Sequence, residues 1–204
     1  MTSISKNMLV NAVFLGLFAI AGTAIVAFTH DHTKHRIVEN KRQHKLEKLH
    51  ELIPPQLLDN DLDTDVIKVN DPLLARDRDV TIYRARKDNK PVAAIIECVA
   101  PDGYSGKIQL LVAVNVDGTL AGVRATEHLE TPGLGDAIET KKSNWIYGFD
   151  GKSLKNPQPE NWKVSRDGGK FDQITSATIT SRAVVKATRN VLKYFESNQK
   201  TIFK

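Results

Sequence analysis

The segment from Met8 to Phe28 constrains this chain more than any other feature, because its 21 residues carry no charged side chain. A helix rises about 1.5 Å per residue, so a helix of this length reaches about 31 Å, close to the hydrocarbon thickness of a bilayer. A cleaved signal peptide has a shorter apolar core, although Ala24 and nearby small residues leave that alternative open. We expect an N-terminal tail over residues 1–7 and a retained transmembrane helix over residues 8–28.

The segment after this span is basic. Six cationic side chains between Lys34 and Lys48 outnumber two acidic ones and account for much of the net charge of +5. A basic stretch beside a membrane span usually contacts lipid headgroups. Nucleic acid is a poor alternative, because the rest of the chain has no basic stripe with interleaved aromatic residues. We therefore expect the lipid bilayer, and no nucleic acid, as a partner.

Residues 29–60 are expected to form a membrane-proximal stalk. A helix is predicted between Ile37 and Leu58, because Leu46, Leu49 and Ile53 stand at i, i+3 and i+7 and so share one face. Pro54-Pro55 ends the helical pattern. Residues 30–36 contain three histidines and an aspartate, but cations surround them and no spacing fixes a coordination geometry. We expect a solvated segment there and no metal site.

Charge does not settle on which side of the membrane the remaining chain lies. Lys6 is the only charged side chain before the span, whereas Lys34, Arg36 and further cations follow it closely. The positive-inside rule would keep the following domain in the cytoplasm, but the rule weakens when a long domain follows the span. The residues alone leave both orientations open.

Residues 61–204 are long enough for one compact domain. Apolar patterns predict four strands, over Val80–Arg86, Val92–Val99, Lys107–Val116 and Thr119–Arg124. Asp117-Gly118, between the last two, is a strong hairpin signal. Ser181–Ser197 is predicted to be an amphipathic helix whose buried face holds Val184, Val185, Thr188, Val191, Leu192 and Phe195. Strands followed by a terminal helix predict a mixed α+β domain.

Several chemistries are disfavoured by what this domain lacks. Its single cysteine, Cys98, cannot form an internal disulfide or hold an iron–sulfur cluster alone, and its place in a predicted strand favours a small buried side chain. The chain contains no GxGxxG, no Walker A loop and no GxSxG elbow. His128 is the only histidine beyond residue 50, so a histidine-based triad is not expected. We expect no catalytic residue.

Three short segments remain that could bind a ligand: a glycine-framed loop over Pro101–Lys107, a turn over His128–Asp136 and a segment over Gly168–Ser181. Five of the seven residues from Thr175 to Ser181 bear hydroxyls, and they stand where the terminal helix begins. Unpaired N–H groups and the helix dipole favour an anion there. Ser and Thr are also the usual helix N-caps, so the residues alone leave a plain cap and plain turns as the alternative.

Taken together and in this order, the three segments resemble the FMN-binding domain shared by two membrane electron-transfer assemblies. The domain occurs in the G subunit of the Rnf ion-translocating complex and in the C subunit of the sodium-pumping NADH:quinone reductase. The family's attachment pattern is Asp, two residues, Ser or Thr, a small residue, Ala and Thr, which matches DQITSAT at residues 172–178. Many members have Gly where this chain has Ser176. The resemblance covers essentially the whole chain, and its compact length favours the G-type subunit, with the C-type as the alternative.

The resemblance implies that FMN is attached covalently through a phosphoester to the hydroxyl of Thr178. A flavin transferase that uses FAD and Mg²⁺ would make this bond: the Thr178 oxygen attacks the phosphorus nearer the riboflavin, and AMP leaves. The chain would then be an electron-carrying subunit of a multi-subunit complex in the bacterial inner membrane, with a periplasmic soluble domain and no turnover alone. A covalent tether would also prevent loss of the flavin by dilution.

Side chains from all three segments are expected around the flavin. Besides Thr178, the predicted site comprises Asp172, Thr175, Ser176, Ala177, Glu130, Thr131, Leu134, Gly135, Tyr104, Ser105 and Lys170. Asp172 is expected either to be recognised by the transferase or to orient the loop. Two alternatives from other functional classes remain, a membrane-anchored binding module without a cofactor and a stand-alone flavin reductase.

Overall fold

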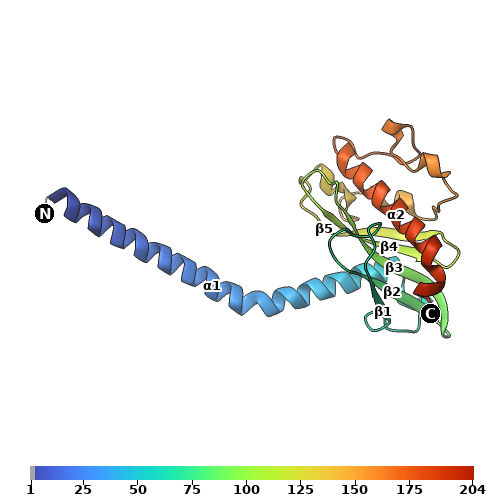
Figure 1. Ribbon diagram of the computed structural model, residues 1–204, viewed down its shortest axis with the longest axis horizontal. Coiled ribbons are helices and arrows are strands. Elements are labelled where there is room, and N and C mark those ends of the chain that lie inside the picture. The colour runs from blue at the N-terminus through green and yellow to red at the C-terminus, as the bar shows by residue number, and fades with distance from the viewer. Residues whose placement is uncertain (1–2) are drawn as a thin grey trace. The chain divides into compact units, whose positions relative to one another are not determined.

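The computed structural model describes residues 3–204, so the first two residues of the predicted N-terminal tail lie outside the described part of the chain. The chain divides into two compact units, one up to His44 and one from Lys45 to Lys204. The first unit consists of a single helix, α1 (Ser3–Leu52), whose last turns belong to the second unit (Figure 1).

Helix α1 is continuous where the sequence predicted a tail, a span and a separate stalk helix. No glycine or proline occurs between Thr23 and Ile53, so nothing in the sequence interrupts the helical backbone there. The helix ends at Leu52, just before Pro54-Pro55, and the 3₁₀ helix η1 (Pro55–Leu57) follows instead of a helix that reaches Leu58. Among residues 3–204, α1 is the one helix long and apolar enough to cross a membrane.

The second unit is built on a five-stranded antiparallel sheet in which each strand pairs with the next along the chain. The strands are β1 (Val66–Val69), β2 (Val80–Lys87), β3 (Lys90–Ala100), β4 (Ile108–Asn115) and β5 (Leu120–Glu127). The four predicted strands are confirmed as β2 to β5. Strand β1 has only four residues, too few for a periodic pattern to show in the sequence. Gly118, with a φ of 84°, forms the predicted turn between β4 and β5.

Both faces of the sheet are covered, which explains the nearly continuous apolar run in β3. Successive strand residues point to opposite faces, and here Ile96 and Cys98 pack in one core while Ala93 and Ile95 pack in another, beside Leu49 at the end of α1. Burial raises the pKa of the Cys98 thiol to about 12. The prediction that Cys98 is a small buried side chain is confirmed.

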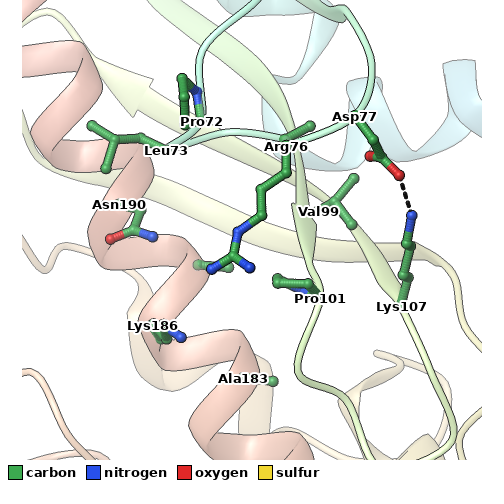
Figure 2. A pocket seen from close by; sticks show the side chains of 12 residues that line it. Pro72, Leu73, Arg76, Asp77, Val99, Pro101, Lys107, Ala183, Lys186 and Asn190 are labelled. Carbon is green, nitrogen blue, oxygen red and sulfur yellow. Dashed lines mark hydrogen bonds and ion pairs between the residues drawn. The ribbon is translucent and has the colours of Figure 1, made fainter.

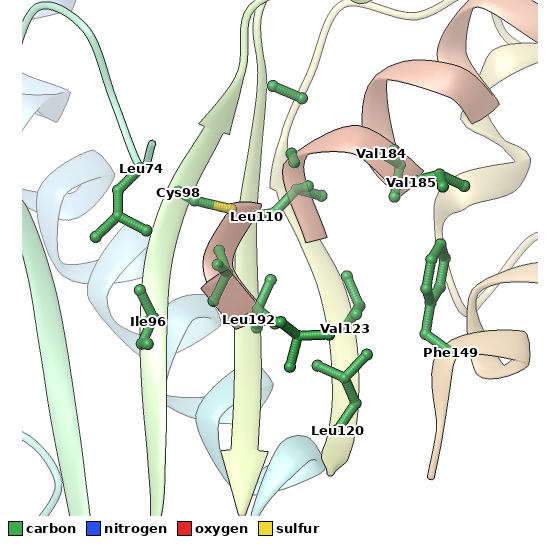
Figure 3. Close-up of a cluster of buried hydrophobic side chains, with 14 of the residues drawn as sticks. Leu74, Ile96, Cys98, Leu110, Leu120, Val123, Phe149, Val184, Val185 and Leu192 are labelled. Atoms are coloured by element: carbon green, nitrogen blue, oxygen red, sulfur yellow. The ribbon is translucent and has the colours of Figure 1, made fainter. Parts of the chain in front are cut away.

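Helix α2 (Thr178–Ile202) covers the face of the sheet that carries the larger core (Figures 1 and 3). All six residues of its predicted apolar face are buried. The helix extends beyond the predicted range at both ends. A sheet with this terminal helix confirms the predicted α+β domain.

The segment between β5 and α2 contains four 3₁₀ helices: η2 (Gly135–Ile138), η3 (Trp145–Phe149), η4 (Pro159–Asn161) and η5 (Ser165–Asp167). An aromatic cluster holds it together: the Phe171 ring lies 4.9 Å from that of Phe149 and 4.7 Å from that of Trp162. This packing fixes the chain that leads into α2 although it has little regular structure.

Candidate functional site

The sheet topology brings the three segments singled out in the sequence to one end of the domain. Strand β3 ends at Ala100, β4 begins at Ile108 and β5 ends at Glu127. In an antiparallel sheet, the end of one strand lies beside the start of the next. The Pro101–Lys107 loop and the His128–Asp136 turn therefore begin at the same end of the sheet.

These segments meet the first turn of α2 around a pocket of about 570 Å³, a volume typical of small-molecule sites. The pocket is lined by Tyr104, Glu130, Thr131, Leu134, Gly135, Arg166, Ser176, Ala177, Thr178, Ile179 and Thr180. Eight of the predicted site residues are thus brought together, Thr178 among them.

The other four predicted residues lie outside this lining. Ser105 is adjacent, because its backbone N–H donates to Glu130 Oε1 over 3.1 Å. The backbone oxygen of Asp172 accepts a hydrogen bond from the Trp145 indole at 2.6 Å, and its side chain is exposed. Thr175 and Lys170 are exposed. The position of Asp172 suits a residue that orients its loop and leaves its carboxylate accessible.

The buried carboxylate of Glu130 ties the pocket's three walls together. Its Oε1 accepts the Ser105 N–H, and its Oε2 accepts a hydrogen bond from the hydroxyl of Thr180. Gly135 also packs tightly here, since a Cβ atom on it would lie 2.7 Å from Glu130 Oε2. The glycine lets the turn approach the carboxylate closely, which a larger residue would prevent.

His128 holds the start of the same turn. Its Nδ1 accepts the backbone N–H of Glu130 at 3.2 Å, and its Nε2 lies 3.0 Å from Glu139 Oε1. An Nδ1 that accepts a hydrogen bond places the ring proton of a neutral histidine on Nε2, from where it is donated to Glu139. The only histidine of the domain beyond residue 50 therefore has a structural role beside the pocket.

Helix α2 begins without a side-chain cap. Ala177 is the N-cap residue and makes no side-chain capping hydrogen bond, so the plain Ser/Thr cap left open by the sequence is not what the structure contains. The Ser181 hydroxyl instead accepts the Ile174 N–H and donates to the Ala177 carbonyl, both at 3.0 Å. The first N–H groups of a helix lack intrahelical acceptors, and here the residues of the first turn, Thr178 to Thr180, line the pocket.

Ser176 adopts a left-handed backbone conformation with a φ of 63°. Glycine adopts this conformation at little cost, whereas a residue with a Cβ atom is strained by roughly 1 kcal/mol. The strain gives a physical reason for the Gly that many members of the resembled family have at this position. It also turns the chain sharply just before Thr178.

Arg166 lines the pocket, although nothing in the sequence singled it out. The segment that carries it is fastened by Gln173, whose Oε1 accepts the Ser165 hydroxyl at 2.7 Å and the Arg166 N–H at 3.2 Å. Ile179 and Thr180 were also missed, although both follow directly on the predicted attachment position. The approach of Arg166 depends on the irregular η5 segment, which leaves no periodic signal.

The lining fits a ligand with a phosphate and a planar apolar group. The uncapped start of α2 and the Arg166 guanidinium supply the donors and positive charge that a phosphate needs. Tyr104, Leu134 and Ile179 are 68%, 42% and 46% exposed, so this rim leaves apolar surface for a ring system.

Comparison with known proteins agrees with this geometry. The FMN-binding domain family matches residues 103–193, which include all the pocket-lining residues, and the RnfG N-terminal region matches residues 1–52. A relative from Pseudomonas aeruginosa is 48% identical over 97% of this chain and 92% of its own length. A relative from Shewanella loihica is 43% identical over 97% of this chain and 93% of its own length. A relative from Vibrio cholerae is 41% identical over 99% of this chain and 95% of its own length.

Each of these three relatives is named as the G subunit of an ion-translocating oxidoreductase complex. The match to the RnfG N-terminal region covers the apolar helix, and the FMN-binding match covers the pocket. The resemblance to the G-type subunit is therefore confirmed. This chain belongs to the family of G subunits of ion-translocating oxidoreductase complexes, and its FMN-binding domain follows the N-terminal helix in the sequence.

Proposed function

We propose that this chain is the electron-carrying G subunit of a membrane-bound ion-translocating oxidoreductase complex, with FMN joined by a phosphoester to the Thr178 hydroxyl. The observation that carries the proposal is the placement of Thr178 in the first, uncapped turn of α2, inside the pocket of the FMN-binding domain. A phosphate on this hydroxyl would sit where N–H groups and the helix dipole favour an anion.

The surrounding residues would bind and orient the cofactor. The Arg166 guanidinium would offset the negative charge that a phosphodiester retains, and Ser176 and Ala177 are small enough to let the phosphate approach the backbone. Tyr104, Leu134 and Ile179 would cover the ring and exclude water from one side. When bound, the flavin supplies the electron transfer, because its ring can accept electrons singly.

The attachment would be made by a flavin transferase that uses FAD and Mg²⁺. Thr175, Ser176 and Asp172 are exposed, so the segment before Thr178 is accessible to another protein. In this proposal, the transferase recognises the Asp172 carboxylate. The backbone oxygen of Asp172 accepts a hydrogen bond from the Trp145 indole, which keeps the loop in place.

The proposed orientation places the soluble domain in the periplasm, with α1 in the inner membrane. A long domain after the span can be translocated despite the cations that follow Phe28. A covalent flavin suits this location, because a dissociated cofactor would be diluted outside the cytoplasm. A reporter fused after Lys204 should be active only in the periplasm, and cytoplasmic activity would contradict the orientation.

The covalent bond is tested on the full chain purified from its native membrane. Wild-type protein should keep flavin fluorescence on a denaturing gel, and the Thr178→Ala variant should lose it. Thr175→Ala is the matched control, because Thr175 is an exposed threonine outside the pocket lining and should keep its fluorescence. A wild-type mass equal to that of the bare polypeptide, or flavin on a peptide without Thr178, would overturn the proposal.

A further inference from the structure

A second pocket, of about 280 Å³, lies between the 72–77 loop and α2 (Figure 2). This second pocket borders the proposed flavin site. Pro101 and Lys107 line the second pocket, and Tyr104, which stands between them in the chain, lines the proposed flavin pocket. A molecule bound here would therefore lie next to the flavin-binding loop.

The walls of this second pocket are apolar and its rim is cationic. Leu73, Val99 and Ala187 are among the apolar lining residues, and Leu73 is 39% exposed. Three cations, Arg76, Lys107 and Lys186, line it against the single carboxylate of Asp77. The pocket therefore offers an apolar side chain a place to insert and offers carboxylates positive partners.

The cations remain available to a partner. Lys107 pairs with Asp77, and Lys186 pairs with Asp102, but these four side chains are all at least half exposed, and exposed ion pairs contribute little stability. Arg76 forms no ion pair within residues 3–204, and Figure 2 shows its side chain lying across the pocket between Asn190 and Pro101. Asp102 lies near enough for Lys186 and Arg76 to lower the pKa of its carboxyl. Its side chain is half exposed, so the Arg76 guanidinium remains suited to a carboxylate from outside the domain.

The positive charge continues along α2. Arg182, Lys186, Arg189 and Lys193 follow one another at intervals of four, three and four residues, which places them on one ridge of the helix. Arg182 already pairs with Asp167 at 2.6 Å, so the charge offered to a partner comes mainly from the other three. Lys200 extends the ridge, and Glu196 is its only acidic side chain. The Nε atom of Arg189 is buried and has no hydrogen-bond partner in the part of the chain that the structure describes. Lys186 belongs both to the pocket lining and to this ridge, so the ridge continues the basic side of the pocket along α2.

We propose that the second pocket and the α2 ridge form a docking surface for an acidic segment of another subunit of the same membrane complex. The inference rests on the proposed function, which makes this chain part of such a complex. An apolar side chain of the segment inserts between Leu73 and Ala187, and its carboxylates pair with Arg76 and the ridge. Docking there brings the partner beside the Pro101–Lys107 loop, and hence beside the flavin that must exchange electrons with it.

Charge reversal tests the docking surface in the assembled complex. The complex is purified from native membranes through a tag on a different subunit, and the amount of this chain per tagged subunit is measured. Arg76→Glu combined with Lys186→Glu should lower that amount about tenfold, because like charges would then face each other across the interface. Raising the salt concentration should weaken retention of the wild-type chain.

Lys68→Glu combined with Lys90→Glu is the matched control. Both lysines are exposed, Lys68 in β1 and Lys90 in β3, and neither lines the pocket, and the change in net charge is identical. The control should be retained like the wild type.

Both double variants should keep their covalent flavin and thermal midpoint, which shows that they fold. Reversal of Arg76 and Lys186 without loss of retention would overturn the docking surface, whereas a wild-type chain absent from the complex would overturn the proposed function instead.

A photoreactive amino acid at position 73 identifies the occupant. Crosslinks from position 73 should map to an Asp- or Glu-rich peptide of another subunit, and crosslinks from position 57, where Leu57 is also exposed, should not. Crosslinking of position 73 to lipid alone, or to a partner segment without acidic residues, would contradict the proposal.

Discussion

The hydroxyl of Thr180, in the first turn of α2, donates a hydrogen bond to the buried carboxylate of Glu130, fifty residues earlier in the chain. Glu130 also accepts the Ser105 N–H. One side chain thereby joins the loop after β3, the turn after β5 and the start of the helix that presents Thr178. The pocket that contains Thr178 is consequently held together by a buried polar contact in its lining.

Replacing Thr180 by valine should lower the free energy of unfolding by about 2 kcal/mol, because a buried carboxylate would lose a donor while the side-chain volume stays similar. Flavin attachment should fall with it. Chemical denaturation of the detergent-solubilised chain, followed by the fluorescence of Trp145 and Trp162, measures the change. Thr175→Val, at an exposed position, should alter stability by less than about 0.5 kcal/mol. Equal effects of the two substitutions would contradict the role of the Glu130 contact.

Ser176→Gly should stabilise the chain by about 0.5–1 kcal/mol, since glycine removes the strain of a φ of 63° at some cost in unfolded-state entropy. Ser176→Val should destabilise it, because a β-branched side chain fits this conformation poorly. Thermal unfolding of both variants gives the comparison. The glycine variant should keep its covalent flavin, and a loss of attachment would show that the serine side chain itself is required.

Thr188→Val should raise the free energy of unfolding by about 1 kcal/mol. The Thr188 hydroxyl is fully buried and has no hydrogen-bond partner among residues 3–204, so an apolar group of the same shape removes an uncompensated desolvation cost. Ser181→Ala is the informative contrast, because the Ser181 hydroxyl makes two hydrogen bonds and its loss should destabilise by about 1–2 kcal/mol. Denaturation midpoints that move in the same direction for both variants would be inconsistent with this difference.

Glu97 should make stability depend on pH in the acidic range. Burial raises the pKa of its carboxyl, but the Lys45 ammonium at 2.8 Å and hydrogen bonds from Thr81 and Tyr83 lower it by more, so the pKa lies below its ordinary value. The unfolded chain then binds this proton more tightly than the folded one. The contribution is present at neutral pH and is lost as pH falls through the folded-state pKa.

Glu97→Gln should therefore flatten the decline in unfolding free energy between about pH 5 and pH 3. Glu196→Gln, at an exposed position on α2, should leave the decline as it is in the wild type. Parallel pH profiles for wild type and Glu97→Gln would exclude this carboxyl as a source of the pH dependence.

The amino-acid sequence by itself determined the elements whose signals are local. A charge-free run of sufficient length predicted the N-terminal apolar helix. Alternation predicted β2, a nearly continuous apolar run predicted β3, and the Asp117-Gly118 hairpin signal marked β4 and β5. Helical spacing predicted the buried face of α2. Family resemblance added the attachment motif, which ends at Thr178. These features depend on neighbouring residues, so the order of residues is enough to reveal them.

Only the tertiary structure decided which distant residues meet. It brought Arg166 to the pocket that contains Thr178, buried Glu130 against Thr180, and laid Arg76 beside α2, more than a hundred residues later in the chain. It also left Lys170, Asp172 and Thr175 outside the pocket lining. The physical reason is that such contacts depend on how loops close over a packed core, and irregular loops such as residues 72–77 and η5 carry no periodicity that reports where they will lie.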